Sequence, residues 1–309
     1  MRTIGVIDIG SNSIKLLVAS KGEDGKLVPI TQTTEETRIG IGILNDQPRL
    51  MDSGMDAACH SVKLLKAKAE ASAADSILVV ATSAVREAIN RDQFTTRLMK
   101  VTGLEVEVLS GREEAKMIGL GIGCDPEFGS MSDFYVIDLG GGSLEAIKFR
   151  DRLIEQAVSL PLGSVRLTEK FIADPEMAFR IEDQARIESH VRELIEASPF
   201  TFDLPAEAVV VVTGGTAAAV RLIRETMDDA SPAGSISLKD LENLLSVLGV
   251  LALSERRRFP GLPPKRADIF PTALSTLLAV FALGDFDHCK QSFYNLRYGI
   301  AMRHLSVGS

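Results

Sequence analysis

The sequence lacks the residue patterns of a disulfide-rich or zinc-binding protein. Its three cysteines, Cys59, Cys124 and Cys289, are odd in number and include no CxxC pair. The four histidines show neither HExxH nor HxxxH spacing. These patterns argue against a zinc site and are typical of a reducing, cytoplasmic setting.

Long apolar runs and an excess of basic residues are also missing. The longest apolar stretch, residues 270–284, falls short of the roughly 20 residues that a membrane span needs, so we predict a buried helix there. The first residues, MRTIGVIDIG, read as a strand and not as a charged-then-apolar signal segment. The formal net charge of −8 disfavours general nucleic-acid binding. A local group of Arg and Lys side chains remains compatible with a polyphosphate or nucleotide ligand.

Length and element pattern predict a two-domain α/β protein. With 309 residues, 45% of them hydrophobic, the chain should form two domains of about 130–180 residues. Strand-like and helical segments alternate, which is typical of α/β architecture. A polar, turn-rich stretch at 125–133 predicts a boundary between domains 1–128 and 129–309. From about Ser237 onward we expect mostly helix.

One pattern occurs twice in the chain. The first copy is VIDIGSNS at 6–13 and the second is VIDLGGGS at 136–143. In each copy an apolar strand ends at an Asp, and a Gly/Ser turn then offers backbone N–H groups and hydroxyls to an anion. The repeat predicts two similar halves that face one cleft, each with a phosphate loop. The predicted phosphate-binding residues of these loops are Gly10, Ser11, Asn12, Ser13, Gly140, Gly141, Gly142 and Ser143.

Asp8 and Asp138 stand directly before the two loops. A single Asp-x-Gly is explained by an Asx-turn that caps a hairpin, but two copies at matched positions favour a functional role. Carboxylates beside an anion-binding loop repel the ligand unless a cation lies between them, and Mg²⁺ prefers one or two carboxylates with waters and phosphate oxygens. We therefore predict that Asp8 and Asp138 bind Mg²⁺, with Glu145 as a further or water-mediated metal ligand.

A third Gly-rich loop, Thr213-Gly214-Gly215-Thr216, lies between an apolar run at 209–212 and an Ala-rich helix. The sequence of strand, Gly-Gly and helix N-terminus is typical of phosphate sites, because free N–H groups and the helix dipole attract anions there. We add Gly214, Gly215 and Thr216 to the predicted phosphate-binding residues.

The segment Ser110-Gly111-Arg112-Glu113-Glu114 predicts the start of a helix with a capping box between Ser110 and Glu113. That interaction gives Glu113 a structural role. Glu114 lies about 100° further round the helix and is left without one. A carboxylate in this position can accept the proton of an attacking water molecule, so Glu114 is the predicted catalytic base.

Two arginine positions allow alternative interpretations. Arg86 follows a strand-like run and either pairs with a neighbouring Glu at the surface or clamps a phosphate with its planar fork; we predict the phosphate contact. The run Arg256–Arg258 is best explained as a solvated helix C-terminus.

These segments together resemble the exopolyphosphatase/guanosine pentaphosphate phosphohydrolase (Ppx/GppA) family, within the actin-like ATPase superfamily of duplicated domains. The segments ATSAVREAIN and SGREEA are the more specific ones. The similar pieces, in chain order, are 6–18, 81–90, 109–122, 136–149, 159–171 and 211–220.

The resemblance implies two actin-like (ribonuclease H-like) domains and Mg²⁺-dependent hydrolysis of a terminal phosphoanhydride bond by water. It places the catalytic base at Glu114, acidic metal-associated positions at Asp138 and Glu145, and a substrate-binding arginine at Arg86. Its phosphate loops fall on Ser11, Asn12, Gly141, Gly142 and Ser143. Two features depart from the family pattern: Leu144 replaces a Thr, and the chain stops at Ser309, as in a short form without additional C-terminal domains.

We therefore expect a phosphohydrolase that releases terminal orthophosphate from inorganic polyphosphate, guanosine pentaphosphate or both, without a membrane or nucleic-acid partner. Two alternatives stay open. One is a kinase of the same superfamily, and the other is a catalytically weak sensor that binds guanosine tetra- or pentaphosphate. The apolar C-terminal helices are either core or the interface of a homodimer.

Overall fold

The computed structural model describes residues 2–42, 47–227 and 235–306. Packing divides the chain into two compact units, Met1–Ser130 with Tyr294–Ser309, and Met131–Phe293. The chain passes from the first unit to the second after Ser130, close to the predicted boundary at 128. The expected second domain, however, included everything up to residue 309. The last helix instead belongs to the first unit, because it packs on α4 and β1 there.

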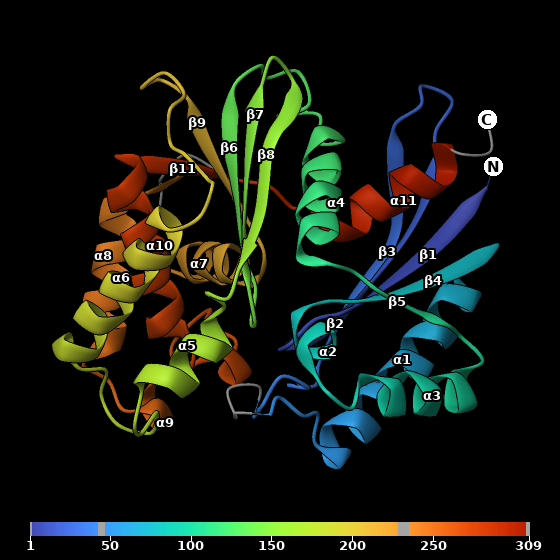
Figure 1. Ribbon diagram of the computed structural model, residues 1–309, viewed down its shortest axis with the longest axis horizontal. Helices are drawn as coiled ribbons and strands as arrows, with labels where there is room; N and C mark the ends of the chain where they lie inside the picture. The colour runs from blue at the N-terminus through green and yellow to red at the C-terminus, as the bar shows by residue number, and fades with distance from the viewer. Residues whose placement is uncertain (1, 43–46, 228–234, 307–309) are drawn as a thin grey trace. The chain divides into compact units, whose positions relative to one another are not determined.

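The first unit is built on a sheet of five strands in the order β3-β2-β1-β4-β5. β1, β2 and β3 are antiparallel, whereas β4 and β5 run parallel to β1. Helices α1 and α3 pack on one face of this sheet and α11 contacts β1 and β2 (Figure 1). The elements are β1 (Thr3–Ile9), β2 (Ser13–Lys21), β3 (Leu27–Glu36), α1 (Asp52–Ala71), β4 (Ser76–Ala81), α2 (Ser83–Glu87), α3 (Arg91–Thr102), β5 (Val106–Val108), α4 (Gly111–Gly123) and α11 (Leu296–Ser306).

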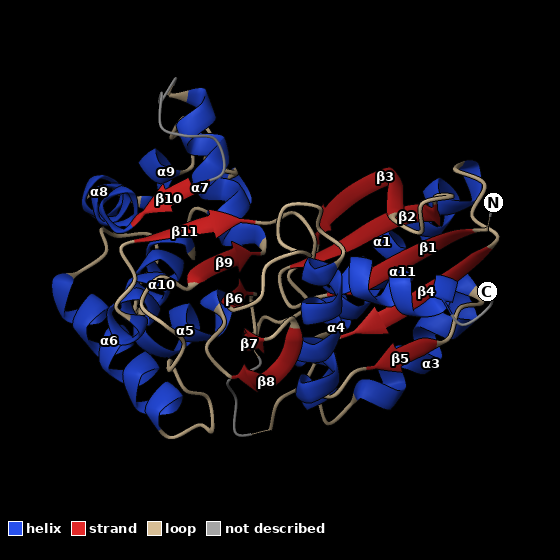
Figure 2. Ribbon diagram, turned by 90° about the horizontal axis from the view of Figure 1, so that it is seen from above, coloured by secondary structure: helices blue, strands red, loops and turns tan. Residues whose placement is uncertain are grey.

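The second unit repeats this topology. Its sheet has the order β10-β11-β9-β6-β7-β8, with β6 to β8 antiparallel, β9 parallel to β6, and β11 parallel to β9. Figure 2 shows its strands in red, with helices gathered beside β9 and β11. The elements are β6 (Phe134–Leu139), β7 (Leu144–Arg150), β8 (Leu153–Leu160), α5 (Ser164–Phe171), α6 (Ile181–Glu196), β9 (Val209–Thr213), α7 (Gly215–Thr226), β10 (Ser235–Ser237), α8 (Leu238–Gly249), α9 (Leu253–Arg256), η1 (Pro264–Arg266), α10 (Phe270–Gly284) and β11 (His288–Gln291).

Both units thus place their first three strands as an antiparallel set and add parallel strands beside the first. This is the ribonuclease H-like arrangement, and its occurrence twice in one chain is the actin-like fold. The predicted duplicated α/β architecture is confirmed.

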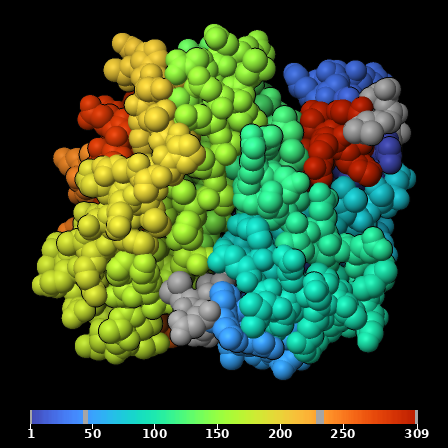
Figure 3. Space-filling view, in the orientation of Figure 1, coloured from blue at the N-terminus to red at the C-terminus, as the bar shows by residue number. Residues whose placement is uncertain are grey.

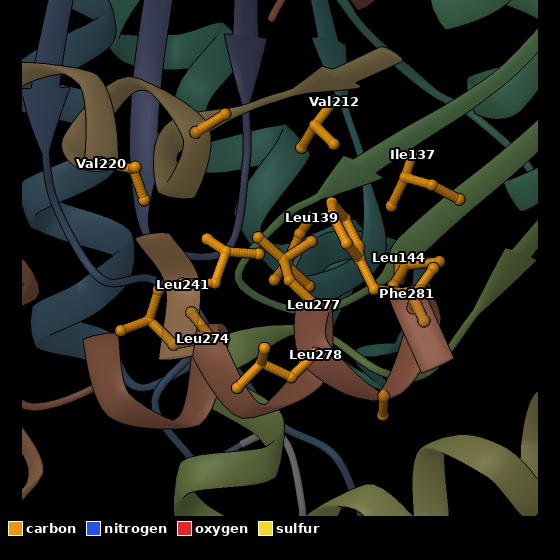
Figure 4. Packing of buried hydrophobic residues seen from close by; sticks show 14 of the residues in the cluster. Ile137, Leu139, Leu144, Val212, Val220, Leu241, Leu274, Leu277, Leu278 and Phe281 are labelled. Carbon is orange, nitrogen blue, oxygen red and sulfur yellow. The ribbon is translucent and has the colours of Figure 1, made fainter. Parts of the chain in front are cut away.

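The apolar helix predicted at 270–284 forms the centre of the second unit. Leu274, Leu277 and Phe281 of α10 are buried in one hydrophobic cluster with residues of β6, β7 and β9 (Figure 4). In contrast, α6 lies on the surface, where its yellow atoms are visible in Figure 3. α10 is therefore core. Within the described part of the chain, no helix is long and apolar enough to cross a membrane.

Two strands of the second half were not predicted, and one expectation about a side chain was wrong. The strands are β8 (Leu153–Leu160) and β11 (His288–Gln291); the second is a short break in a stretch that is otherwise mostly helical, as expected. Arg256 is not solvated: it is 2% exposed, and its Nη2 donates to the carbonyl oxygens of Pro175 and Met177 at 2.8 and 2.9 Å. This side chain joins the loop before α6 to α9.

Candidate functional site

The two predicted phosphate loops have the same backbone geometry. In the loop between β1 and β2, Gly10 N donates to Ser13 O at 3.1 Å. In the loop between β6 and β7, Gly140 N donates to Ser143 O at 3.0 Å. The repeat in the sequence is therefore a repeat in structure, with one such loop in each unit.

In each sheet, the Asp before the loop is paired with residues at equivalent positions on the neighbouring strands. In the second unit, Asp138 of β6 pairs with Thr213 of β9 and with Glu145 of β7. Residues directly opposite each other on neighbouring strands share a face, so Asp138 and Glu145 lie on one face. Glu145 is 2% exposed, and Ser159 Oγ donates to its Oε1 at 2.7 Å.

The corresponding row in the first unit carries a different charge. Asp8 of β1 pairs with Lys15 of β2. Burial raises the pKa of the Asp8 carboxyl, against the attraction of Lys15 and Arg297. The first unit thus places one acid and one base where the second unit places two acids.

Several polar atoms of the first loop are buried and make no hydrogen bond within the described residues. They are Asp8 Oδ1, Ser11 Oγ, and both amide atoms of Asn12. Ser11 and Asn12 are each 4% exposed. Buried polar atoms are nearly always satisfied in folded proteins, so this loop has the character of a ligand site.

The residues present fit a magnesium ion that takes most of its ligands from substrate phosphate and water. Among the described residues, no three His, Cys, Asp or Glu side chains come together as a complete metal site. Mg²⁺ commonly uses only one or two carboxylates and takes its remaining ligands from water and substrate phosphates. In the second unit the Asp138–Glu145 pair suits such an ion; in the first unit the only matched acid is Asp8, whose Oδ1 has no hydrogen-bond partner among the described residues.

The third loop lies against Asp138. Gly214 has a φ of 92°, and a Cβ on it would lie 2.4 Å from Asp138 Oδ1. α7 begins at Gly215, and the buried Thr216 Oγ in its first turn has no hydrogen-bond partner within the described residues. The predicted start of a helix at this loop is confirmed.

Sequence reasoning missed two arginines of the second unit. Arg266, 9% exposed, lies so close to Gly215 that a Cβ there would be 2.3 Å from its Nη1. Arg166, 8% exposed, donates from Nε to Gly142 O at 2.7 Å. Both guanidinium groups therefore lie at Gly-rich loops that were predicted to bind phosphate.

Glu114 lies in the first turn of α4, which begins with the predicted capping box. Ser110 N and Oγ donate to Glu113 Oε2 at 2.8 and 2.6 Å, and Glu113 N donates to Ser110 Oγ at 3.3 Å. Glu113 is thereby engaged in the cap. Glu114 is 6% exposed and is not part of it.

Arg86, the last basic residue of α2, pairs with Glu114. Its Nη1 donates to Glu114 Oε2 at 2.7 Å and to the carbonyl oxygen of Leu109 at 3.0 Å. The neighbouring Glu87 instead accepts from Ser83 Oγ at 2.8 Å. The structure therefore brings the predicted base and the predicted substrate-binding arginine into direct contact.

Leu144 does not face the phosphate loop. Its side chain is fully buried in the cluster that contains Ile137, Leu139 and Phe281 (Figure 4). A Leu at this position is therefore a core residue.

Two duplicated units, each with a strand–loop–strand Gly-rich turn, define a protein of the actin-like fold. More narrowly, the chain belongs to the Ppx/GppA phosphatase family, whose model matches residues 17–306.

Solved structures show the same fold. An exopolyphosphatase from Cytophaga hutchinsonii is 24% identical, with a TM-score of 0.85 over 100% of this chain and 99% of the other. The Ppx/GppA family member from Aquifex aeolicus is also 24% identical, with a TM-score of 0.76 over 100% and 99% of the two chains. An exopolyphosphatase-like protein, again 24% identical, has a TM-score of 0.86 over 98% and 97%.

Proposed function

We propose that this protein is a Mg²⁺-dependent exopolyphosphatase that releases terminal orthophosphate from inorganic polyphosphate, guanosine pentaphosphate or both. The observation that carries the proposal is the buried Glu114 carboxylate, held by Arg86 at the start of α4. Both substrates present the same terminal phosphate group, so the chemistry of the site suits either. The free cysteines suit the cytoplasmic setting that we propose.

Glu114 is the proposed catalytic base. The hydrogen bond from Arg86 to Oε2 fixes the orientation of the carboxylate. An oriented carboxylate can take a proton from water as the water attacks phosphorus. In this proposal the role of Arg86 is to orient Glu114 through their hydrogen bond. Its contact with phosphate stays a prediction.

The Gly-rich loops are the proposed phosphate-binding groups. Backbone N–H groups of Ser11–Ser13 and Gly141–Ser143, the first turn of α7 and the Arg266 guanidinium supply donors and positive charge. Mg²⁺ would be held by Asp138 and Glu145 in the second unit, with Asp8 as the proposed metal ligand of the first, and would supply further positive charge against the phosphates. Donors that are fixed before the substrate arrives stabilise developing charge without reorganisation.

The test is orthophosphate release from purified protein with Mg²⁺ on medium-chain polyphosphate, guanosine pentaphosphate and ATP in parallel. Glu114→Gln is expected to lower kcat by about 10²–10⁴-fold with little change in KM. Glu113→Gln is the matched control, because Gln also completes a capping box and should leave the rate nearly unchanged.

Full activity in the Glu114→Gln variant would contradict the role of this residue. Transfer from ATP to an added acceptor would reveal the kinase instead. Tight guanosine pentaphosphate binding without phosphate release would indicate the sensor. Because Leu144 is buried, its difference from the family's Thr does not itself favour the sensor.

A further inference from the structure

Three successive carbonyl oxygens of the second phosphate loop, those of Gly140, Gly141 and Gly142, are held by one short segment, Gly163–Arg166, at the start of α5. Gly140 O accepts from Ser164 N at 3.0 Å and from Ser164 Oγ at 3.2 Å. Gly141 O accepts from Val165 N at 2.9 Å and from Arg166 N at 3.2 Å. Gly142 O accepts from Arg166 Nε at 2.7 Å.

These bonds determine where the loop's N–H groups point. In a trans peptide the N–H of each residue is directed opposite to the preceding carbonyl oxygen. Because three successive carbonyl oxygens point toward α5, the N–H groups of Gly141, Gly142 and Ser143 point away from it. Within the described ranges these N–H groups donate to no protein acceptor. They form an open row of donors of the kind that binds anions.

The contact between α5 and the loop depends on a glycine. A Cβ on Gly163 would lie 2.3 Å from Gly141 O and 2.3 Å from the carbonyl carbon of Gly142. Both neighbours are backbone atoms of the loop, which cannot move aside without turning its peptide planes. The segment therefore packs directly on the loop and fixes its conformation.

The first unit has the same arrangement with backbone groups alone. Gly40 N donates to Ser11 O at 2.8 Å, and Arg38 N donates to Asn12 O at 3.1 Å. A Cβ on Gly40 would lie 2.7 Å from Ser11 Cβ. In both units the holding segment follows the third strand of the sheet. The second unit adds two side chains, those of Ser164 and Arg166, to the holding groups in these contacts.

We propose that Arg166 is a positioning residue for phosphate recognition in the second loop. Its Nε holds the Gly142 carbonyl and thereby directs the Ser143 N–H toward a phosphate oxygen of the ligand. The guanidinium acts through the backbone and not as the phosphate ligand itself. This inference rests on the proposed function, in which the loop binds the terminal phosphates of the substrate.

The test combines a binding measurement with the state of the free loop. Full-length protein labelled with ¹⁵N-glycine is titrated with orthophosphate, and the amide resonances of Gly141 and Gly142 are followed. Arg166→Met should shift these resonances before any phosphate is added, and should weaken orthophosphate binding by about 10-fold. Arg166→Lys should recover part of the affinity. Arg186→Met is the matched control, because its Nη2 donates to the carbonyl oxygen of Phe171 at the other end of α5; it should change neither readout.

Weakened binding with unshifted free-state resonances would make Arg166 a direct phosphate ligand and overturn the proposal. Unchanged affinity in Arg166→Met would also overturn it. The outcome for the proposed function is separate: a wild-type protein that binds orthophosphate at this loop but hydrolyses no substrate would refute the hydrolase and leave the role of Arg166 intact.

Discussion

Lys15 in the first unit stands where Glu145 stands in the second, opposite the Asp that occurs in both copies of the repeat. This one difference separates the roles of the two aspartates. Asp8 has a protein cation beside it, whereas Asp138 faces another acid. Two neighbouring carboxylates repel each other unless a cation lies nearby. The second unit therefore has the greater need for a bound metal ion.

A metal titration tests this difference. Asp138→Asn should raise the Mg²⁺ concentration for half-maximal phosphate release by about 10-fold or more, because it removes a hard oxygen ligand. Asp8→Asn should raise it less. Identical titration curves for wild type and Asp138→Asn would contradict a metal role for Asp138.

Leu144 supplies a second prediction for a single residue. Leu144→Thr exposes the core to a hydroxyl and leaves a cavity, so it should lower the free energy of unfolding by about 2–4 kcal/mol. The KM for polyphosphate should stay the same, because the side chain points into the core. Urea unfolding and steady-state kinetics measure both quantities, with Leu144→Met as the volume-conserving control. A lower KM in the Thr variant would show that position 144 reaches the ligand after all.

Among the elements, β7 and β8 are joined to the loop before β9 by a buried lysine. Lys148 of β7 is 1% exposed, and its Nζ donates to Asp203 Oδ1 at 2.7 Å and pairs with Glu155 Oε2 at 2.8 Å. The hydrogen bonds from Lys148 lower the pKa of both carboxyls. Ionised partners therefore stabilise this part of the sheet.

The direction of the pH dependence follows from these lowered pKa values. Stabilisation is complete above the ordinary carboxyl pKa of about 4 and is lost as the pH falls through the lowered values in the folded protein. Asp203→Asn should therefore reduce stability at neutral pH and flatten its loss in acid. Urea midpoints measured from neutral pH down to acid test this, with the exposed Glu207→Gln as control. An unaltered acid profile in Asp203→Asn would argue against the cluster.

The elements that the sequence predicts well are those whose signal is local. The capping box links Ser110 to Glu113 within one turn, and the repeat links Asp8 to Gly10 within one hairpin, so spacing alone identifies them. β11 was not predicted because its four residues, HCKQ, show no apolar alternation. β8 was not predicted because most of its residues are only partly buried, so its sequence carries a weak strand pattern.

Contacts between segments far apart in the sequence could not be predicted from residue spacing. Arg166 meets Gly142 from 24 positions away, and Arg266 meets Gly215 from a separate short helix. Neither arginine belongs to a local pattern. Arg256 was misread for a related reason: a run of three arginines suggests a solvated surface, yet its partners are carbonyl oxygens of the loop before α6.

At the scale of the whole molecule, the two units differ in whether they are continuous in sequence. The second unit is one continuous segment, Met131–Phe293, whereas the first needs both ends of the chain. α11 completes the first unit: Arg297 Nη1 donates to Leu16 O at 2.9 Å, and a Cβ on Gly299 would lie 1.8 Å from Met117 O of α4. The helix is thus closely packed against the rest of its unit.

This division predicts different behaviour for the two fragments. A fragment of residues 131–293 should fold by itself and unfold cooperatively, because it retains its own core. Residues 1–130 alone should not, since they lack the helix that covers part of the sheet. Circular dichroism during urea unfolding measures both, and adding a peptide of residues 294–306 to fragment 1–130 should restore cooperative unfolding. Cooperative unfolding of 1–130 without the peptide would contradict this account of α11.

The discontinuous first unit also orders events on the ribosome. Its sheet strands leave the exit tunnel before the second unit does, but α11, which packs against them, is made only after the second unit. The intervening unit can fold while translation is still under way. The opening half of the protein must wait as an incomplete intermediate, with the α11-binding side of its sheet uncovered. Newly made chains should therefore depend most on chaperones through this half, although it is synthesised first.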